Sequence, residues 1–296
     1  KYLKILKNMN FKNFFYNKTI IVTGHTGFKG SWLSLWLRTF GAKVVGISID
    51  VPTKHSHFKA IKLQDKIKHI KMDIRNLKIL KKTFKKYKPD YVFHLAAQPL
   101  VKKSYLDPVN TWSTNTIGTL NVLESLREIN KRCIAILITS DKSYKNLEIK
   151  RGYKEDDILG GKDPYSASKA SAEIIISSYI HSFFPKIKTK VRIGVARAGN
   201  VIGGGDWAEN RIVPDCMRAW SNHKPVTIRA PHATRPWQHV LEPLSGYLLL
   251  GSRLYNNDFL HGESYNFGPQ IAENNTVLDL VKKMGESWEK VKWICN

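Results

Sequence analysis

Cysteine, long apolar runs and acidic residues are all scarce in this sequence. The three cysteines, Cys133, Cys216 and Cys295, lie far apart, and none belongs to a CxxC pair. His55 and His57 form an HxH pair without an evident third ligand, so we expect neither a disulfide framework nor a bound metal. No apolar run reaches the roughly 18 residues that a membrane-spanning helix needs, so we expect a cytoplasmic protein without a membrane partner.

Acidic residues number 24 against 48 lysines and arginines, which gives a formal net charge of +24. Such an excess is typical of nucleic-acid-binding proteins, and a basic binding or regulatory protein on a Rossmann scaffold stays one alternative. The lysines, however, are scattered. Residues 78–88 place Ile79, Leu80, Phe84 and Tyr87 on one side of a predicted helix, which leaves its lysines as a solvated face. We therefore expect no nucleic-acid partner.

β-branched apolar runs alternate with helical patterns over the first two thirds of the chain. The sequence predicts strands at residues 19–23, 43–49, 67–72, 91–95, 135–139 and 190–197. It predicts helices at residues 29–39, 78–88, 109–129 and 166–183. Strands separated by helices of this length form βαβ units, so the predicted fold class is α/β, with a Rossmann-type, doubly wound parallel sheet.

The pattern changes after residue 198, where the chain becomes irregular and rich in proline. Short helices are predicted near residues 212–220, 241–254 and 277–290. We expect an N-terminal extension at 1–17 and a Rossmann domain at 18–198, whose sheet the predicted strand at 190–197 completes. A smaller, partly interleaved substrate-binding region is expected at 199–296.

Gly24, Gly27 and Gly30 follow the first predicted strand and open the first helix. Because glycine has no side chain, the backbone here can approach a pyrophosphate closely. The free amides at the start of the helix then bind its negative charge. Asp50 stands twenty residues beyond Gly30 at the end of the second strand, where a carboxylate binds ribose hydroxyls and repels a 2′-phosphate. The pattern predicts an NAD site. A glycine turn with a solvated Asp50 is the alternative, because GxxGxxG departs from the GxGxxG fingerprint.

Tyr165 and Lys169 are four residues apart at the start of a predicted helix and so share one face. The Lys169 ammonium, together with the positive nicotinamide, lowers the cost of forming phenolate, which makes Tyr165 a usable base for a sugar hydroxyl. Ser140 ends the preceding strand, where its hydroxyl can share the substrate proton. YxxxK alone is common by chance, and its place after a glycine-rich strand gives it weight.

Several motifs together resemble the extended short-chain dehydrogenase/reductase family: TGHTGFKG, HLAAQ at 94–98, Asn115, TSDK at 139–142 and PYSASK. RAGNVIGGGDW at 197–207 and RPWQHVLEPL at 235–244 are similar to motifs of its sugar-nucleotide dehydratases that act on CDP-glucose. The resemblance implies a Rossmann fold, tightly held NAD, a nucleotide-sugar substrate, a homo-oligomer (dimer or tetramer) and a redox-neutral lyase reaction. Members of the family extend beyond residue 296, which leaves a C-terminal truncation open.

The resemblance also assigns site residues. The catalytic set is Ser140, Asp141, Lys142, Tyr165 and Lys169. The cofactor-binding set is Gly24, His25, Gly27, Phe28, Lys29, Gly30, Asp50, Asp73, Ile74, Leu95, Ala96, Ala97, Asn115, Tyr165 and Lys169. The substrate-binding set is Gln98, Ser140, Asn200, Arg211 and Arg235.

The implied mechanism oxidises C4 of the sugar, eliminates water across C5 and C6, and returns the hydride to C6. Many such dehydratases use an Asp–Glu pair for the elimination, whereas this chain has Asp141–Lys142. Lys142 is a base only when its amine is neutral, and the adjacent Asp141 opposes this. The alternative role for Asp141 and Lys142 is therefore an ion pair at the end of the strand. The alternative enzyme is a sugar-nucleotide 4-epimerase, whose reaction would use neither residue.

Other residues give weaker signals. Arg192 and Arg218 are further candidates for substrate contacts, or else surface charges. Trp207 and Trp237 can form a wall of the site or stack on a base, although an aromatic residue in a core is the commoner case.

Overall fold

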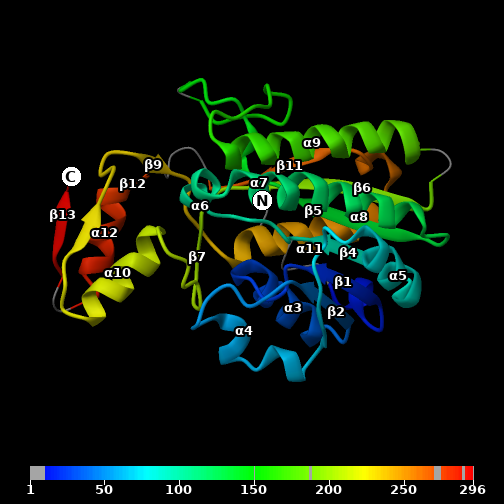
Figure 1. Cartoon of the computed structure of the whole chain (residues 1–296), viewed down its shortest axis with the longest axis horizontal. Helices are drawn as coiled ribbons and strands as arrows, with labels where there is room; N and C mark the ends of the chain where they lie inside the picture. The colour runs from blue at the N-terminus through cyan, green and yellow to red at the C-terminus, as the bar shows by residue number, and fades with distance from the viewer. Residues whose placement is uncertain (1–10, 150, 187–188, 270–274, 289–290, 296) are drawn as a thin grey trace.

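The computed structural model describes residues 11–149, 151–186, 189–269, 275–288 and 291–295 (Figure 1). Within these residues, seven strands form one parallel sheet in the order β11-β6-β5-β4-β1-β2-β3. They are β1 (Thr19–Thr23), β2 (Lys43–Ser48), β3 (Lys68–Lys71), β4 (Tyr91–His94), β5 (Cys133–Ile138), β6 (Val191–Ala198) and β11 (Ser264–Phe267). Thr23 pairs with Ile47 of β2 and His94 of β4, so the carboxyl ends of the central strands meet at one edge.

Helices cover both faces of the sheet. They are α2 (Lys12–Phe15), α3 (Phe28–Thr39), α4 (His57–Ala60), α5 (Leu77–Tyr87), α6 (Val101–Leu106), α7 (Pro108–Trp112), α8 (Gly118–Arg127), α9 (Pro164–Phe183), α10 (Ile212–Ser221), α11 (Leu241–Asn256) and α12 (Val277–Gly285). α3 and α11 lie on one face, whereas α5, α8 and α9 cover the other (Figure 1). No helix in the described ranges is both long and apolar enough to cross a membrane.

The central strands are buried on both faces. In β1, Ile20 and Val22 pack with residues of α3 and α11, whereas Ile21 packs with residues of α5, α8 and α9. Two-sided burial explains why the predicted strands are continuous apolar runs without polar alternation. The predicted fold class, α/β with a Rossmann-type, doubly wound parallel sheet, is confirmed.

Residues 190–197 do not complete the sheet, contrary to the prediction. β6 pairs on its outer side with β11, and α11 packs against β5 and β6. β11 is only four residues long, each of them half-buried, and its sequence SYNF contains no apolar run and too short an alternation of polar and aromatic residues to mark a strand. The region after residue 198 therefore contributes a strand and a helix to the Rossmann sheet.

The rest of the C-terminal region forms a small unit of its own (Figure 1). α10 and α12 pack with β8 (Val226–Ile228), which pairs with β13 (Trp293–Cys295), around the buried Trp220. Two further strand pairs are β7 (Val201–Ile202) with β10 (Gln238–His239) and β9 (Thr234–Arg235) with β12 (Asn275–Thr276). The helix predicted at 277–290 ends at Gly285, and residues 289–290 lie outside the described part of the chain.

Two finer predictions need correction. Residues 1–10 of the predicted N-terminal extension lie outside the described residues, but Phe15 is fully buried in the core of the sheet, so α2 belongs to the Rossmann unit. In α5, Leu80 and Phe84 are buried, whereas Ile79 is 47% exposed and not on the apolar side. Ile79 precedes Leu80 by about 100° of helical rotation, which turns it away from the sheet.

Candidate active site

The glycine loop lies between the end of β1 and the start of α3. Gly24 has a φ of +76°, a conformation that L side chains rarely adopt. A Cβ at Gly24 would lie 2.7 Å from the backbone nitrogen of Ala96, and a Cβ at Gly30 would lie 2.1 Å from the Gly24 carbonyl oxygen. The loop, the first turn of α3 and the residues after β4 are therefore in direct backbone contact.

This loop fits a dinucleotide. α3 begins at Phe28, and Gly27 in the N-cap position has no side chain to cap it, so the amides of the first turn are suited to an anion. Thr26 ties the loop to the end of β2, because its hydroxyl donates to the Asp50 carbonyl oxygen at 2.6 Å and its amide donates to the Ser48 hydroxyl at 3.3 Å. The exposed Asp50 carboxylate thus follows β2 beside the loop, where ribose recognition needs it.

His25 directs its side chain into the protein interior. The ring is fully buried, with Nδ1 3.0 Å from the Ser48 hydroxyl and Nε2 2.7 Å from Nδ1 of His69. A Cβ at Gly46 would overlap this ring at 2.3 Å. The imidazole of His25 therefore supports the loop from the β2–β3 side, and only its backbone remains for a ligand.

Two buried histidines make the stability of the fold depend on pH. Burial lowers the pKa of His25 to about 4 and, with a smaller effect from the Lys169 charge, the pKa of His94 to about 3. The unfolded chain takes up these protons below about pH 6.5, whereas the native state does not. Because the unfolded state then binds more protons, stability is lost as pH falls from about 6.5 toward these lowered values.

For His94 alone we expect a loss of about 2 kcal/mol in the free energy of unfolding between pH 6.5 and 5, since each pKa unit is worth about 1.4 kcal/mol. His94→Gln can still bond Thr23 and Thr119, and it should make the free energy of unfolding depend less steeply on pH. His181→Gln, at an exposed site, should leave that pH dependence unchanged. Urea unfolding at pH 7, 6 and 5 measures this. Parallel curves for the wild-type chain and His94→Gln would contradict it.

The residues after β3 and β4 border the same edge of the sheet. Residues 95–97 are half-buried, and the Ala96 amide donates to the Thr23 hydroxyl at 3.2 Å. Asp73 is held by Arg75, whose Nη2 lies 2.6 Å from its carboxylate; burial raises the pKa of Asp73, but these hydrogen bonds outweigh it and lower the pKa. Ile74 is buried against Gly118. The side chains of Asp73 and Ile74 are thus engaged within the protein, and their assignment to the cofactor stays a prediction.

Asn115 connects the residues after β4 with α9. It lies in a π-helical turn, η2 (Ser113–Ile117), which interrupts the single helix predicted at 109–129. Its Nδ2 donates to the Ser168 hydroxyl at 2.9 Å, and its Oδ1 accepts from the Gln98 amide at 2.8 Å. π-helical turns often occur at functional sites, and this one holds the first turns of α9, with Tyr165 and Lys169, against the sheet edge.

Gln98, predicted to bind substrate, is 5% exposed and bonded within its own loop. Its Nε2 donates to the Thr111 hydroxyl at 2.9 Å, and its Oε1 accepts from the Leu100 amide at 2.7 Å. The structure therefore gives this side chain a part in shaping the loop, which a sequence motif does not distinguish from substrate binding.

Tyr165 and Ser140 meet at the carboxyl end of β5. α9 begins at Pro164, with Asp163 as its cap, so Tyr165 lies in the first turn, where it is 8% exposed. Burial raises the pKa of the Tyr165 phenol above its ordinary value, and the neighbouring Ser140 hydroxyl opposes this rise. The Ser140 hydroxyl is thus placed to pass a proton to and from Tyr165.

Lys169 lies one turn further along α9 and is 6% exposed. Its amine donates to the carbonyl oxygen of Ile138 at 3.5 Å. Burial lowers its pKa to about 8, against the charge of Glu173, which raises it. Near neutral pH the amine is still mostly an ammonium, the form that eases ionisation of Tyr165.

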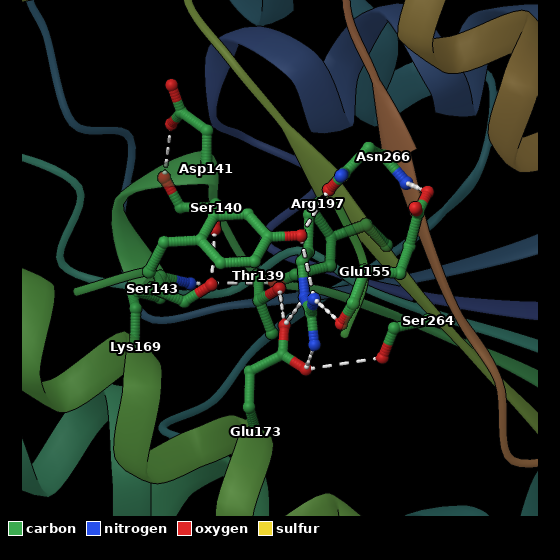
Figure 2. Close-up of polar contacts among 12 residues, drawn as sticks. Thr139, Ser140, Asp141, Ser143, Glu155, Lys169, Glu173, Arg197, Ser264 and Asn266 are labelled. Carbon is green, nitrogen blue, oxygen red and sulfur yellow. Dashed lines mark hydrogen bonds and ion pairs between the residues drawn. The ribbon is translucent and has the colours of Figure 1, made fainter. Parts of the chain in front are cut away.

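Asp141 and Lys142 form the short turn η3 (Asp141–Ser143), directly after Ser140. The Ser140 hydroxyl donates to Asp141 Oδ1 at 3.0 Å (Figure 2). It also accepts from the Lys142 amide at 3.2 Å. Both side chains are half-buried. The negative charge of Asp141 raises the pKa values of Tyr165 and Lys29, so its carboxylate faces the same space as these groups.

Lys29, assigned to the cofactor from its motif, reaches across to α11. Its Nζ donates to the Tyr247 hydroxyl at 3.1 Å. Burial lowers its pKa to about 8, helped by the charges of Arg211 and Lys169 and opposed by Asp141. Tyr247 is fully buried, 218 residues away in the chain, and no sequence pattern pointed to it.

The predicted substrate residues differ in their placement. Arg211 is half-buried, pairs with Asp206 at 2.9 Å and lowers the pKa of Tyr165, so it borders the catalytic residues. Asn200 is half-buried after β6, and its carbonyl accepts from the Gln238 amide. Arg235 is exposed on β9.

Of the weaker candidates, Arg192 lies near the amino end of β6 and bonds the Leu254 carbonyl, far along the strand from the site edge. Arg218 pairs with Asp215 and donates to the Trp207 carbonyl, so it holds the loop before α10. Trp207 is 38% exposed, which places it outside the core.

His57 stacks on Trp32 at 4.1 Å between ring centroids, while His55 lies 5.5 Å from the Trp207 ring. The HxH pair therefore serves aromatic packing between α3 and the GGGDW loop at 203–207. Within the described residues, no three metal-ligating side chains form a group.

A family model described as GDP-mannose 4,6 dehydratase matches residues 21–293. A CDP-glucose 4,6-dehydratase of Salmonella typhimurium is 47% identical over 289 residues, which are 96% of this chain and 80% of that protein. An epimerase from Methanothermobacter thermautotrophicus is 24% identical, with a TM-score of 0.82 over 97% of this chain and 82% of that one. A dTDP-glucose 4,6-dehydratase double mutant from Streptomyces venezuelae, solved with NAD bound, is 18% identical, with a TM-score of 0.77 over 94% and 84%.

The two solved structures are similar to this chain in fold alone. The family model covers almost the whole chain, and the Salmonella relative shares nearly half of its residues. This chain therefore belongs to the GDP-mannose 4,6-dehydratase family of sugar-nucleotide enzymes.

Proposed function

We propose that this chain binds NAD and converts CDP-D-glucose to CDP-4-dehydro-6-deoxy-D-glucose and water. The observation that supports this best is the meeting of Ser140 and Tyr165 at the carboxyl end of β5, with the Asp141–Lys142 turn beside them. The glycine loop and the first turn of α9 border the same edge of the sheet. CDP-glucose is favoured because the 47% identical relative is a CDP-glucose 4,6-dehydratase.

The proposed steps divide among the residues at this edge. Bound NAD supplies a reversible hydride acceptor for C4 and donor for C6. Tyr165, assisted by Ser140, takes the proton of the 4-hydroxyl as C4 becomes a ketone. Ser140, whose hydroxyl donates to Asp141, passes that proton from Tyr165 to the Asp141 carboxylate. The ketone acidifies the C5 hydrogen, so a neutral Lys142 amine takes that proton while Asp141 gives its newly acquired proton to the departing 6-hydroxyl, and one water is lost. Lys142 returns its proton to C5 when hydride reaches C6.

Cations around this space suit a nucleoside diphosphate. The charges of Arg211 and Lys169 both act on Lys29, and the carboxylate of Asp141 opposes them. Guanidinium and ammonium groups bind phosphate oxygens, so we propose that Arg211 and Arg235 contact the diphosphate, with Asn200 beside the sugar.

Incubation with CDP-glucose, UDP-glucose and dTDP-glucose in parallel tests the function. We expect the mass loss of one water with CDP-glucose, and transfer of a C4 deuterium label to C6. Return of the label to C4 without loss of water would instead identify a 4-epimerase. No turnover of any nucleotide sugar, with salt-sensitive binding to nucleic acid, would favour the basic binding protein.

We propose a cytoplasmic homo-oligomer, a dimer or tetramer, joined through α6, α7 and α9. Leu106 and Val109 are each 78% exposed, and Ile174 of the adjacent α9 is 60% exposed. Apolar surface gathered in this way is typical of interfaces between copies. We expect Val109→Asp to shift the sedimentation coefficient to that of the monomer, whereas Ile294→Asp, at an exposed site in the small C-terminal unit, should not. Identical sedimentation of both variants would contradict this interface.

A further inference from the structure

A buried ion pair lies directly behind the catalytic residues. Glu173 of α9 and Arg197 of β6 are each 4% exposed. Their charged groups meet through two contacts, from Arg197 Nε to Glu173 Oε1 and from Nη2 to Oε2, each 2.9 Å (Figure 2). Thr139 also donates to Oε1, and Ser264 donates to Oε2 at 3.4 Å. A buried charge is costly unless it is paired, and here both charges are paired.

Arg197 also fixes the segment that follows Asp141. Its Nη1 donates to the Tyr144 hydroxyl at 2.7 Å and to the Glu155 carbonyl at 2.8 Å. The Tyr144 hydroxyl in turn donates to Asn266 Oδ1 of β11 at 2.7 Å. Tyr144 directly follows η3, so the guanidinium holds one end of the turn that carries Asp141, while Ser140 lies at the other end.

Glu173 acts on Lys169 through its charge. The two residues are one helical turn apart on α9, and the carboxylate keeps the pKa of Lys169 higher than burial alone would leave it. Both carboxylate oxygens are bonded to Arg197, whereas the Lys169 amine donates to the Ile138 carbonyl. Glu173 therefore stabilises the ammonium while the amine stays bonded to the Ile138 carbonyl. The other charged or titratable groups that act on Lys169 are Lys29 of α3 and His94 of β4.

We propose that Glu173 and Arg197 are a pair of positioning residues, which holds the Ser140–Tyr144 segment against α9 and fixes a carboxylate one helical turn from Lys169. The pair serves both halves of the catalytic arrangement at once, because one partner lies on the helix of Tyr165 and Lys169 and the other bonds Tyr144. The inference rests on the proposed function for its kinetic readout alone.

The first test removes the charge and keeps the shape. Glu173→Gln can still accept from Arg197 and Thr139, but it leaves the guanidinium charge uncompensated. We expect the Lys169 amine to titrate about 1 pH unit lower than in the wild-type chain. The measurement is a carbon-detected NMR titration of lysine side chains in the unliganded protein, with the Lys169 signal identified by its loss in Lys169→Arg. In the pH profile of kcat, the decline on the alkaline side should shift to lower pH by the same amount.

The second test keeps the positive charge of residue 197 and removes the several donors of its guanidinium group. Arg197→Lys retains a cation beside Glu173 but cannot bond the carboxylate twice and reach Tyr144 and Glu155 as well. We expect the pKa of the Lys169 amine to stay unchanged. We expect kcat to fall by up to about 100-fold, because the η3 turn that carries Asp141 and Lys142 is displaced. The two variants thus separate the electrostatic effect from the geometric one.

Glu128→Gln is the matched control, because Glu128 pairs with Lys81 at an exposed site and should change neither readout. If Glu173→Gln does not fold, Glu173→Gln combined with Arg197→Met leaves no unpaired guanidinium and should still lower the pKa of the Lys169 amine. An unchanged Lys169 titration in a folded Glu173 variant, or a wild-type kcat in Arg197→Lys, overturns the inference. If the wild-type chain turned over no nucleotide sugar, the proposed function would fail, yet the NMR titration would still test this pair.

Discussion

Replacing Tyr165 with phenylalanine is expected to lower kcat for the dehydration by about 10³-fold, because a positioned acid–base group contributes roughly 10²–10⁴-fold. The change removes one oxygen beside the Ser140 hydroxyl and leaves the ring that packs on α9 in place. The loss should therefore fall on kcat, while the Kd values of NAD and the nucleotide sugar change little. Steady-state kinetics and calorimetric titration of each ligand measure the two effects separately.

Tyr179→Phe is the matched control for this variant. Tyr179 lies on the same helix and loses an equivalent hydroxyl, but that hydroxyl donates to Glu124 on the outer face of α8. We expect kcat of Tyr179→Phe to stay within twofold of the wild-type value. Equal activity of both variants would mean that the proton of the 4-hydroxyl goes elsewhere, and the assignment of Tyr165 would be wrong.

The Rossmann unit could be predicted from the sequence because its signals are local. Each central strand is an apolar run buried on both faces, as Ile20, Ile21 and Val22 illustrate. The glycine loop follows such a strand directly, so Gly24 and Gly30 could be placed at the helix start without knowledge of distant contacts. The same holds for Tyr165 and Lys169, whose shared face follows from helical spacing alone.

What the sequence did not indicate depends on contacts between distant segments. β11 is short and half-buried, and only its pairing with β6 makes it a strand of the sheet. Lys29 meets Tyr247 across 218 residues, and Arg197 meets Tyr144 across 53. The lowered pKa of Lys29 follows from burial, which no local pattern reports.

Motifs also do not separate ligand contact from support of the loop. Gln98 and His25 both lie in family motifs, yet their side chains are bonded to Thr111 and Ser48 inside the protein. A residue needed to shape a binding loop occurs in the motif as regularly as one that touches the ligand. Only the partners of each polar atom decide between the two.

Gly30→Ala is expected to weaken NAD binding by roughly 10- to 100-fold and to destabilise the fold by about 1–3 kcal/mol, the usual cost of overpacking. The added Cβ would lie 2.1 Å from the Gly24 carbonyl oxygen and 2.9 Å from the His25 Cα, and both neighbours are backbone atoms. Gly24 has little room to move toward the sheet in response, because the space where its Cβ would lie is already occupied by the Leu95–Ala96 backbone, with the Ala96 nitrogen 2.7 Å from that position. The loop must therefore shift away from the start of α3, and the amides that would bind the pyrophosphate shift with it.

The control for this change is Gly204→Ala. Gly204 has no atom within 4 Å of an added Cβ, and its φ is not in the left-handed region, so the same chemical change should be tolerated there. Calorimetric titration with NAD and urea unfolding of both variants give the comparison. If Gly30→Ala bound NAD as tightly as Gly204→Ala, the dinucleotide would not lie over the glycine loop. Because the proposed hydride transfer needs the nicotinamide beside Tyr165, the placement of the whole reaction at this edge of the sheet would then have to be abandoned.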